Sequence, residues 1–349
     1  MRLLIIGTGS MARQHVLSFR VIDDVEIVGA VEPNEERLKA FAEEHRIPNT
    51  FPDLEAAIAW GEFDAASNVT PDAFHHPLSM QLIEAGKHVL CEKPLSTNYP
   101  LALEMTKAAE RRGLINMVNL TFRAAPCLDM ARQIVTSGEI GEIRHFEASY
   151  LQSWLVGHHW GDWRTDERWL WRLSTEHGSH GVIGDIGIHV IDFATYAAGK
   201  DIVWMESRAK TFQKAEGDRI GDYVLDANDS FAMTVELTNG ALGVIHASRW
   251  ATGYANMMRL DVFGSHGALQ MTADGRRSWL GKCIGADIDT QSWREVHCPP
   301  VKTVFQRFAE AIETGENGDP DFRRAADIQR VLDLCLQAGS RSHGGVRLD

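Results

Sequence analysis

The side chains best suited to proton chemistry are a lysine in the first half of this chain and an aspartate and a histidine in the second. Lys93 lies in Leu90-Cys91-Glu92-Lys93-Pro94, where a buried strand should end. Pro94 restricts the residue before it to extended backbone, which directs the lysine ammonium. Asp185 and His189 are four residues apart and would share one face of a helix. Because a histidine near a carboxylate exchanges protons around neutral pH, these residues predict chemistry in addition to binding.

A dinucleotide site is predicted at the start of the chain. Residues 2–6 form a short apolar run that is typical of a buried parallel strand, and they lead into the G-x-G-x-x-A pattern of residues 7–12. Gly7 permits the tight turn, Gly9 leaves room for a pyrophosphate, and Ala12 lets the next helix pack closely on the strand. We therefore expect the cofactor to contact Gly7, Thr8, Gly9, Ser10 and Met11.

The choice between NAD and NADP depends on Glu32. A second strand is predicted at residues 25–31, and Glu32 follows it twenty residues after Ala12, where a carboxylate would bind the adenosine ribose hydroxyls. Two alternatives remain open: Glu32 could simply begin a turn and cap the next helix, or nearby Arg37 could accept a 2′-phosphate. The position of the acid favours NAD, with NADP second.

Two domains are predicted from the order of strands and helices. Strands and helices alternate at residues 63–69, 75–85, 88–91, 99–112 and 114–118. This alternation predicts an α/β fold with a parallel sheet, a Rossmann dinucleotide-binding domain over residues 1–122.

Residues 123–349 are expected to form an α+β domain with a large open, mainly antiparallel sheet. Its expected strands include 230–237 and 241–250, joined by a hairpin at Thr238-Asn239-Gly240, and helices are expected near 303–314 and 321–338.

Two runs of residues carry a resemblance to a known family. Asn68-Val69-Thr70-Pro71-Asp72-Ala73-Phe74-His75, and the stretch from Glu84 through Glu92-Lys93-Pro94 to Ser96, resemble signatures of the Gfo/Idh/MocA oxidoreductases, named for glucose–fructose oxidoreductase and inositol dehydrogenase. The resemblance covers the chain from end to end. It implies hydride transfer between nicotinamide and a secondary alcohol or ketone of a sugar, cyclitol or sugar derivative. It also implies that the cofactor site includes Thr70, Pro71, His75, Glu92 and Lys93.

The resemblance extends to the second half of the chain. An isolated Asp-x-x-x-His is more often a helix cap and a packed histidine, but Asp185 and His189 match family positions that stand beside the counterpart of Lys93 in the active site. In that reading His189 accepts the hydroxyl proton, Lys93 stabilises the oxygen and Asp185 orients the substrate, although Lys93 and His189 could exchange duties. Trp171 and Arg172 match a Trp-Arg pair near the nicotinamide.

The resemblance has one departure, in the segment before Asp185. Gly178-Ser179-His180-Gly181 replaces the glycine triplet that relatives commonly carry. We therefore expect His180 to narrow the substrate pocket, so that the substrate of this protein differs from those of its relatives.

A loop rich in tryptophan and histidine is the predicted substrate region. Aromatic faces and hydrogen-bond donors suit a polyhydroxylated ring, and the candidates are Gln152, Trp154, His158 and His180. The tryptophans could equally seal a domain or subunit interface. Four histidines, at 158, 159, 177 and 180, raise a zinc alternative, but no ligand pattern or thiolate pair accompanies them, so we expect no metal.

Composition limits the partners. A formal net charge of −13 argues against a nucleic acid or an anionic membrane as partner, and no apolar run is long enough to cross a bilayer. Five cysteines without a C-x-x-C motif suit a reducing cytoplasm. The family resemblance adds an expected homodimer or homotetramer built through the C-terminal sheet.

Two other functions remain open. The first is an NADPH-dependent reductase of keto- or anhydro-sugars, which Glu32 argues against. The second is a non-catalytic nucleotide-sensing regulator on the same fold, which the joint presence of Lys93, Asp185 and His189 argues against.

Overall fold

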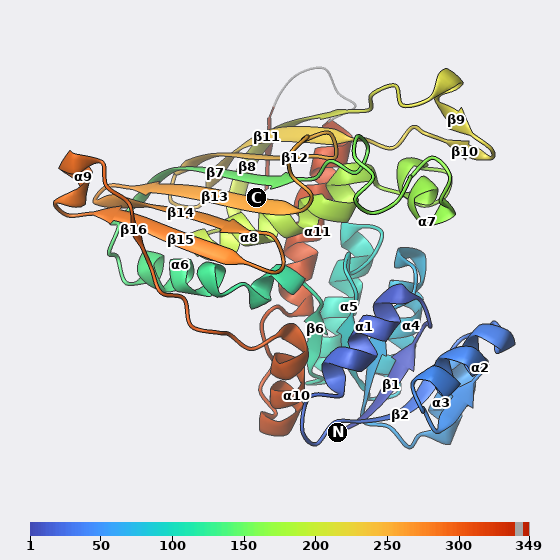
Figure 1. The fold of residues 1–349 in the computed structure, drawn as a ribbon. Helices are drawn as coiled ribbons and strands as arrows, with labels where there is room; N and C mark the ends of the chain where they lie inside the picture. The colour runs from blue at the N-terminus through green and yellow to red at the C-terminus, as the bar shows by residue number, and fades with distance from the viewer. Residues whose placement is uncertain (339–344, 349) are drawn as a thin grey trace. The chain divides into compact units, whose positions relative to one another are not determined.

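The N-terminal part of the chain forms a six-stranded sheet in a computed structural model that describes residues 1–338 and 345–348 (Figure 1). The strand order is β3-β2-β1-β4-β5-β6, and all five neighbouring pairs are parallel. The strands are β1 (Arg2–Ile6), β2 (Glu26–Val31), β3 (Asn49–Phe51), β4 (Ala65–Asn68), β5 (His88–Cys91) and β6 (Asn116–Val118). The predicted Rossmann fold is confirmed.

Helices alternate with these strands, as the pattern of the sequence predicts. They are α1 (Ser10–Phe19), α2 (Glu35–Glu44), α3 (Leu54–Trp60), α4 (Asp72–Glu84) and α5 (Tyr99–Arg111). The apolar run of β1 is buried throughout its last four residues, because a strand covered by helices on both faces has no solvent side. The carboxyl ends of the parallel strands therefore carry the turns that can present side chains to a ligand.

A segment near the end of the chain also belongs to this first unit. The unit comprises Met1–Thr121 and Lys302–Arg330, and the second comprises Phe122–Val301 and Val331–Asp349. A boundary after residue 122 alone would place 302–330 in the second domain. The contacts assign it to the first because α10 (Val304–Thr314) buries an apolar stripe against α1, with the rings of Phe305 and Phe19 5.1 Å apart.

The second unit is built on a nine-stranded sheet. Its order is β16-β15-β14-β13-β7-β12-β11-β8-β17, in which β7 and β12 run parallel and all other neighbours are antiparallel. The strands are β7 (Ile143–Leu151), β8 (Ile202–Lys210), β11 (Ser230–Leu237), β12 (Leu242–Ser248), β13 (Met257–Gly264), β14 (Gly267–Ala273), β15 (Ser278–Ile284), β16 (Arg294–Glu295) and β17 (Val346–Arg347). The predicted mainly antiparallel sheet is confirmed.

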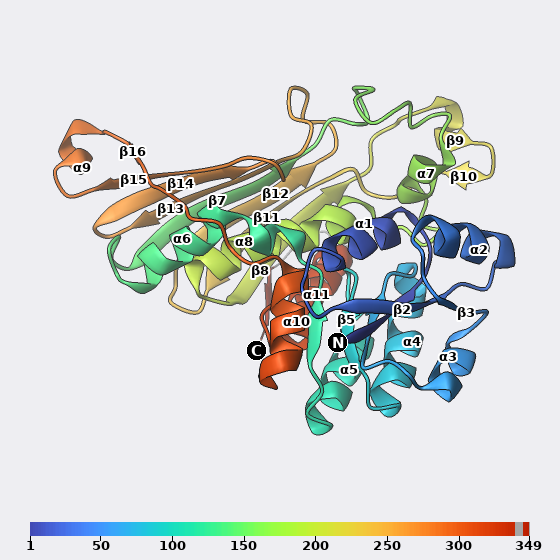
Figure 2. The ribbon, with the colours of Figure 1, turned by 60° about the horizontal axis from the view of Figure 1, so that its bottom comes forward.

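Helices cover one face of this sheet. Helix α8 (Ile188–Ala198) packs on β7, and α6 (Pro126–Thr136) packs on β14 and β15, so both lie on the same face in two views (Figure 1, Figure 2). Along β11, Phe231, Met233 and Val235 are buried and the residues between them are not. This alternation is the period of a strand with one packed face.

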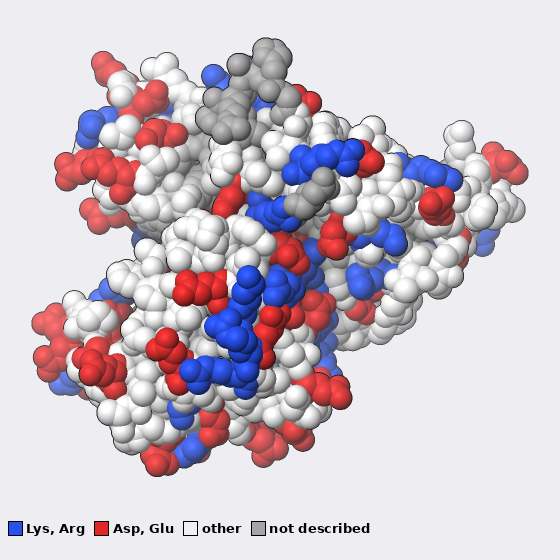
Figure 3. Space-filling model, turned by 180° about the vertical axis from the view of Figure 1, so that it is seen from behind, with Lys and Arg blue, Asp and Glu red and all other residues white. Residues whose placement is uncertain are grey.

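The remaining α-helices and strands of the described residues connect or flank these layers. They are the short helices α7 (Glu167–Leu170) and α9 (Asp287–Thr290), the two-stranded ribbon of β9 (Arg219–Ile220) and β10 (Tyr223–Val224), and α11 (Phe322–Ala338). Among the described residues, no helix has the length and apolar character needed to span a bilayer. Basic and acidic side chains are interleaved on the face shown in Figure 3.

Candidate active site

The turn after β1 has the shape that a dinucleotide pyrophosphate needs. Gly7 has φ +94°, and a Cβ atom there would lie 2.7 Å from the carbonyl oxygen of Val69, so this position requires glycine. Within the described residues, a Cβ atom on Gly9 would meet no heavy atom within 4 Å, and no side chain caps the start of α1. Backbone N–H groups at this helix start can therefore bind phosphate oxygens. Ser10 and Met11 are exposed beside them.

Glu32 is held in place at the end of β2. Its carboxylate accepts a hydrogen bond from Thr8 Oγ1 at 2.8 Å and another from the Asn34 backbone N–H at 3.2 Å. The cap of α2 is Asn34, whose side chain accepts from the backbone of Arg37, so Glu32 is not the helix cap. The Arg37 guanidinium is exposed and lies 3.9 Å from the Glu32 carboxylate. The residues present fit an NAD adenosine ribose at this point.

The turn after β4 is ordered by its own side chains. Thr70 Oγ1 donates to Asn68 Oδ1 at 2.7 Å, and the backbone oxygen of Thr70 lies 2.8 Å from His75 Nε2. The other ring nitrogen of His75 lies 2.7 Å from the carbonyl oxygen of Pro94. Both nitrogens of the buried His75 ring are therefore engaged by the backbone.

Glu92 belongs to a buried polar network that sequence reasoning missed. Its Oε1 lies 2.8 Å from His15 Nε2 and 2.6 Å from Asn119 Nδ2, and His15 Nδ1 lies 2.7 Å from Ser67 Oγ. The other carboxylate oxygen accepts the backbone N–H of Lys93 at 3.1 Å. The Glu92 carboxylate thus joins α1, β4 and the residue after β6 to the backbone of the predicted proton-handling lysine.

The network also sets the charge of Glu92. Burial raises its pKa, but hydrogen bonds from His15 and Asn119 and the charge of Lys93 lower it, to about 2. A negative carboxylate at neutral pH therefore anchors the segment that carries Lys93. The one signal in the sequence was His15, in the helix after the glycine turn, and its position does not identify Glu92 as its partner.

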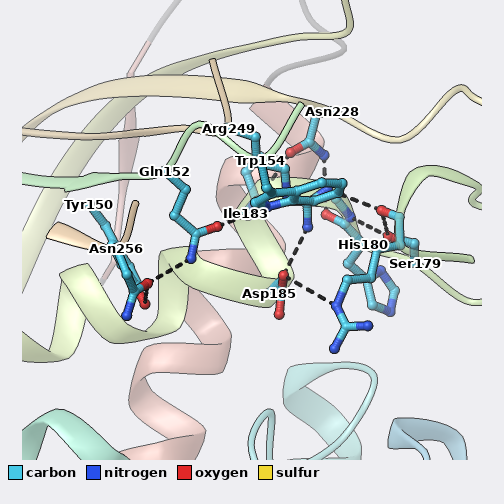
Figure 4. Close-up of polar contacts among 12 residues, drawn as sticks. Tyr150, Gln152, Trp154, Ser179, His180, Ile183, Asp185, Asn228, Arg249 and Asn256 are labelled. Atoms are coloured by element: carbon cyan, nitrogen blue, oxygen red, sulfur yellow. Dashed lines mark hydrogen bonds and ion pairs between the residues drawn. The ribbon is translucent and has the colours of Figure 1, made fainter. Parts of the chain in front are cut away.

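In the second unit, Asp185 lies between two arginines. Its Oδ2 accepts from Arg249 Nη2 at 2.9 Å and lies 3.8 Å from Arg172 Nε (Figure 4). Arg249 is fully buried, its guanidinium lies 5.0 Å from the ring centroid of Trp154, and its Nη1 donates to the carbonyl oxygen of Arg172 at 3.1 Å. Arg249 follows β12 directly, and no motif in the sequence singled it out.

The helix that carries Asp185 and His189 differs from the predicted one. Ile183–Gly187 is a π-helix, and α8 begins only at Ile188. Because a π turn bonds residues five apart, a spacing of four does not stack Asp185 and His189 as a continuous α-helix would. The close approach of Gly184 to His180 accompanies the π turn, since a Cβ atom on Gly184 would lie 2.4 Å from that of His180. The expected helix is present over 184–192, but its first part is a π-helix.

His189 is buried among aromatic rings. Its ring centroid lies 5.5 Å from that of Phe122 and 6.2 Å from that of Tyr150. Burial raises the pKa of Tyr150, so its hydroxyl stays protonated and donates to Asn256 Oδ1 at 2.6 Å. The structure brings Asp185, Arg172 and Trp154 into one cluster through Arg249. His189 lies beside this cluster, against the rings of Phe122 and Tyr150.

The predicted substrate residues occupy different environments. Gln152 bonds to Asn256 at 2.9 Å through its Nε2 and accepts the Trp154 indole N–H at 3.1 Å (Figure 4). His158 is exposed, and the His180 backbone oxygen accepts from Asn228 Nδ2 at 3.1 Å. The Trp171 ring lies 4.5 Å from the Arg172 guanidinium. Gln152 and Trp154 thus share one hydrogen-bonded row, while His158 stands apart from it.

Comparisons with known proteins agree along the chain. Residues 1–120 match the family model described as an oxidoreductase family with an NAD-binding Rossmann fold, and residues 128–270 match the GFO/IDH/MocA C-terminal domain. Levoglucosan dehydrogenase of Pseudarthrobacter phenanthrenivorans is 27% identical over 97% of this chain and 95% of its own. D-glucoside 3-dehydrogenase of Escherichia coli is 29% identical over 69% of this chain and 68% of its own. A levoglucosan dehydrogenase structure with NADH and levoglucosan has a TM-score of 0.86 at 22% identity, covering 100% of this chain and 99% of that one, which shows the shared fold.

Proposed function

The chain belongs to the Gfo/Idh/MocA family of NAD(P)-dependent oxidoreductases, and on this premise we propose that it oxidises a secondary alcohol of a sugar, cyclitol or sugar derivative with NAD, or reduces the matching ketone. The observation that carries the cofactor choice is Glu32, oriented by Thr8 and Asn34 beside the glycine turn. Relatives named as dehydrogenases of levoglucosan and D-glucosides support the substrate class.

The residues that would hold NAD come from the first unit. The N–H groups at the start of α1 would bind the pyrophosphate, and Glu32 would accept the ribose hydroxyls. Bound NAD supplies the acceptor for the hydride that leaves the substrate carbon. The family resemblance adds further proposed cofactor contacts, at Arg37, Thr70, Pro71, Glu92, Lys93, Trp171 and Arg172. It also implies His75, but the buried ring of His75 bonds the backbone of Thr70 and Pro94, so we propose a supporting role for it.

Three side chains are proposed to manage the proton of the substrate hydroxyl. The Lys93 ammonium would hydrogen-bond the reacting oxygen, His189 would accept its proton, and Asp185 would orient the substrate. Lys93 and His189 could exchange these duties. Support comes from the family positions that all three match and from the hydrogen bond with Arg249 that orients the Asp185 carboxylate. Substrate hydroxyls would be bound near Gln152, Trp154, His158 and His180.

Assembly and location belong to the same proposal. We propose a homodimer or homotetramer formed through the uncovered face of the nine-stranded sheet, because alternate residues of β11 there are not buried by the unit itself. A reducing cytoplasm fits the five cysteines, which are free thiols in the structure. The domain roles follow: 1–122 binds the cofactor, and the sheet of 123–349 serves substrate and assembly.

A coenzyme and substrate screen tests the proposal. Reduction of NAD and of NADP is followed spectrophotometrically across polyols, aldoses, glycosides and anhydrosugars, and NADPH oxidation is followed with keto-sugars. The proposal expects turnover of at least one polyhydroxylated alcohol with NAD preferred. Preference for NADPH with a keto-sugar would favour the reductase alternative, and nucleotide binding without turnover of any substrate class would favour the regulator.

A further inference from the structure

His75 lies in the first turn of α4, between the ends of two neighbouring strands. Its side chain is completely buried. On one side is the turn after β4, which carries Thr70, and on the other is the segment after β5, which carries Lys93 and Pro94. The ring therefore connects two turns at the edge of the sheet where parallel strands present ligand-binding residues.

The hydrogen bonds of this ring fix its protonation state. Nδ1 lies 2.7 Å from the carbonyl oxygen of Pro94, and Nε2 lies 2.8 Å from the carbonyl oxygen of Thr70. A carbonyl oxygen only accepts hydrogen bonds, and a neutral imidazole carries a single N–H. Both bonds can therefore form together only when both ring nitrogens are protonated.

We propose that His75 is a buried imidazolium that ties the Thr70 turn to the Lys93-Pro94 segment and so positions Lys93. It is a positioning residue, because its two N–H groups are spent on backbone carbonyls. The positioning role rests on the proposed function, since it presumes that Lys93 acts on substrate. The protonation state does not rest on that function.

Two titratable side chains face the buried ring of His75. They are Asp72 in the first turn of its own helix and the Cys91 side chain at the end of β5. Burial lowers the pKa of His75, while Cys91, Asp72 and the Pro94 carbonyl raise it, to about 10. Because this pKa exceeds the ordinary 6.5, the stabilisation is complete below pH 6.5 and is lost as the pH rises through about 10.

The turn that His75 bonds through Thr70 is also ordered by hydrogen bonds to Asn68. Thr70 Oγ1 donates to Asn68 Oδ1 at 2.7 Å, and Asn68 Nδ2 donates to the backbone oxygen of His75 at 3.2 Å. Asn68, Thr70 and His75 thus form one unit at the end of β4. The backbone of Asn68 already accepts the Glu92 N–H at 2.9 Å, and the bond from His75 to Pro94 adds a second link, on the far side of Lys93.

The protonation state is tested without any assay of activity. The full chain is labelled with ¹⁵N-histidine, and ring nitrogens are correlated with ring protons at pH 8. The proposal expects one histidine to show two N–H nitrogens at this pH, and to lose them only as the pH approaches 10. If every histidine ring shows at most one N–H at pH 8, the imidazolium is excluded.

The positioning role is tested with a matched pair of variants. H75Q removes the second donor site, and the control is H76Q at the next position, where Nε2 pairs with Glu104 at 3.0 Å near the surface. For folded, NAD-binding protein we expect H75Q to lower kcat by about 10- to 100-fold, with a smaller change in KM for NAD. H76Q should keep both constants near those of the parent. A folded H75Q with unchanged kcat and KM would overturn the positioning role.

A second measurement covers the case in which H75Q does not fold. In the parent protein, the backbone amide signals of Thr70 and Lys93 should shift together with the His75 ring as it deprotonates. Amide signals that do not shift as the His75 ring deprotonates would contradict the proposal that His75 ties the Thr70 turn to the Lys93-Pro94 segment. If the parent turns over no substrate but the ring carries two N–H groups, the proposed function fails and the imidazolium stands.

Discussion

Arg249 and Asp185, 64 residues apart in the sequence, form an ion pair in which the arginine side chain is fully buried and the carboxylate is about one-quarter exposed. Arg249 Nη2 donates to Asp185 Oδ2 at 2.9 Å. A buried guanidinium is costly to leave without its hydrogen-bonded carboxylate. Loss of either partner should therefore destabilise the second unit, and the pair fixes the direction of the carboxylate of a proposed active-site acid.

The buried pair predicts a specific loss of stability. R249M should lower the free energy of unfolding by about 2–3 kcal/mol, because a charged hydrogen bond is lost. The control is R168M, whose guanidinium pairs with Asp166 at the surface and is 80% exposed. Denaturant titration followed by tryptophan fluorescence measures both. Equal effects of the two variants would show that the buried pair contributes no more than a surface pair.

Glu32 predicts the coenzyme preference. Its carboxylate would repel a 2′-phosphate, so kcat/KM should favour NAD over NADP by about 1–3 kcal/mol, or roughly 5- to 150-fold. E32Q should reduce this ratio, while E35Q on the exposed start of α2 should leave it unchanged. A parent enzyme that uses NADP as well as NAD would contradict the assignment.

Lys93 predicts a change in turnover without a change in nucleotide binding. K93A should lower kcat by about 100-fold or more, because the reacting oxygen loses its proposed proton and charge partner. The Kd for NAD should stay within severalfold of the parent value. The control is K107A, on α5. Weak NAD binding with normal turnover would make Lys93 a binding residue.

His189 predicts a loss of acid–base chemistry. H189N keeps a polar side chain of similar reach and should slow turnover by about 10²- to 10⁴-fold while the protein stays folded. The control is H145N. His145 lies on β7, its side chain is more exposed than that of His189, and its ring lies 3.7 Å from Glu147. Normal turnover of H189N would return His189 to a packing role among Phe122 and Tyr150.

Glu92 predicts a pH dependence of stability. Its pKa falls from 4.5 to about 2 on folding, so its contribution is present above pH 4.5 and is lost as the pH falls toward 2. The difference in unfolding free energy between the parent and E92Q should therefore be constant above pH 4.5 and narrow below it. Urea titrations at a series of pH values measure this difference. If the difference in unfolding free energy between the parent and E92Q does not narrow below pH 4.5, folding does not lower the pKa of Glu92.

Local patterns in the sequence determined the elements and their order. The sequence predicted a strand over 230–237 before an Asn-Gly hairpin, which is where β11 lies, and the glycine turn predicted the junction of β1 and α1. These features depend on residues within a few positions of each other, because a strand repeats every two residues and a glycine with positive φ is required by its own turn. The family resemblance extended this reading to the site residues.

Only the tertiary structure decided which distant residues meet. The sequence predicted a helix near 303–314, where α10 lies, but the partner of this helix, the Phe19 side of α1, is far away in the chain. Glu92 receives His15 from 77 residues away, and Asp185 receives Arg249 from 64. The π-helix at 183–187 belongs to the same class, since glycine permits it but packing selects it. The sequence gives the charge and length of each side chain, whereas the residue that it contacts depends on how the whole chain folds.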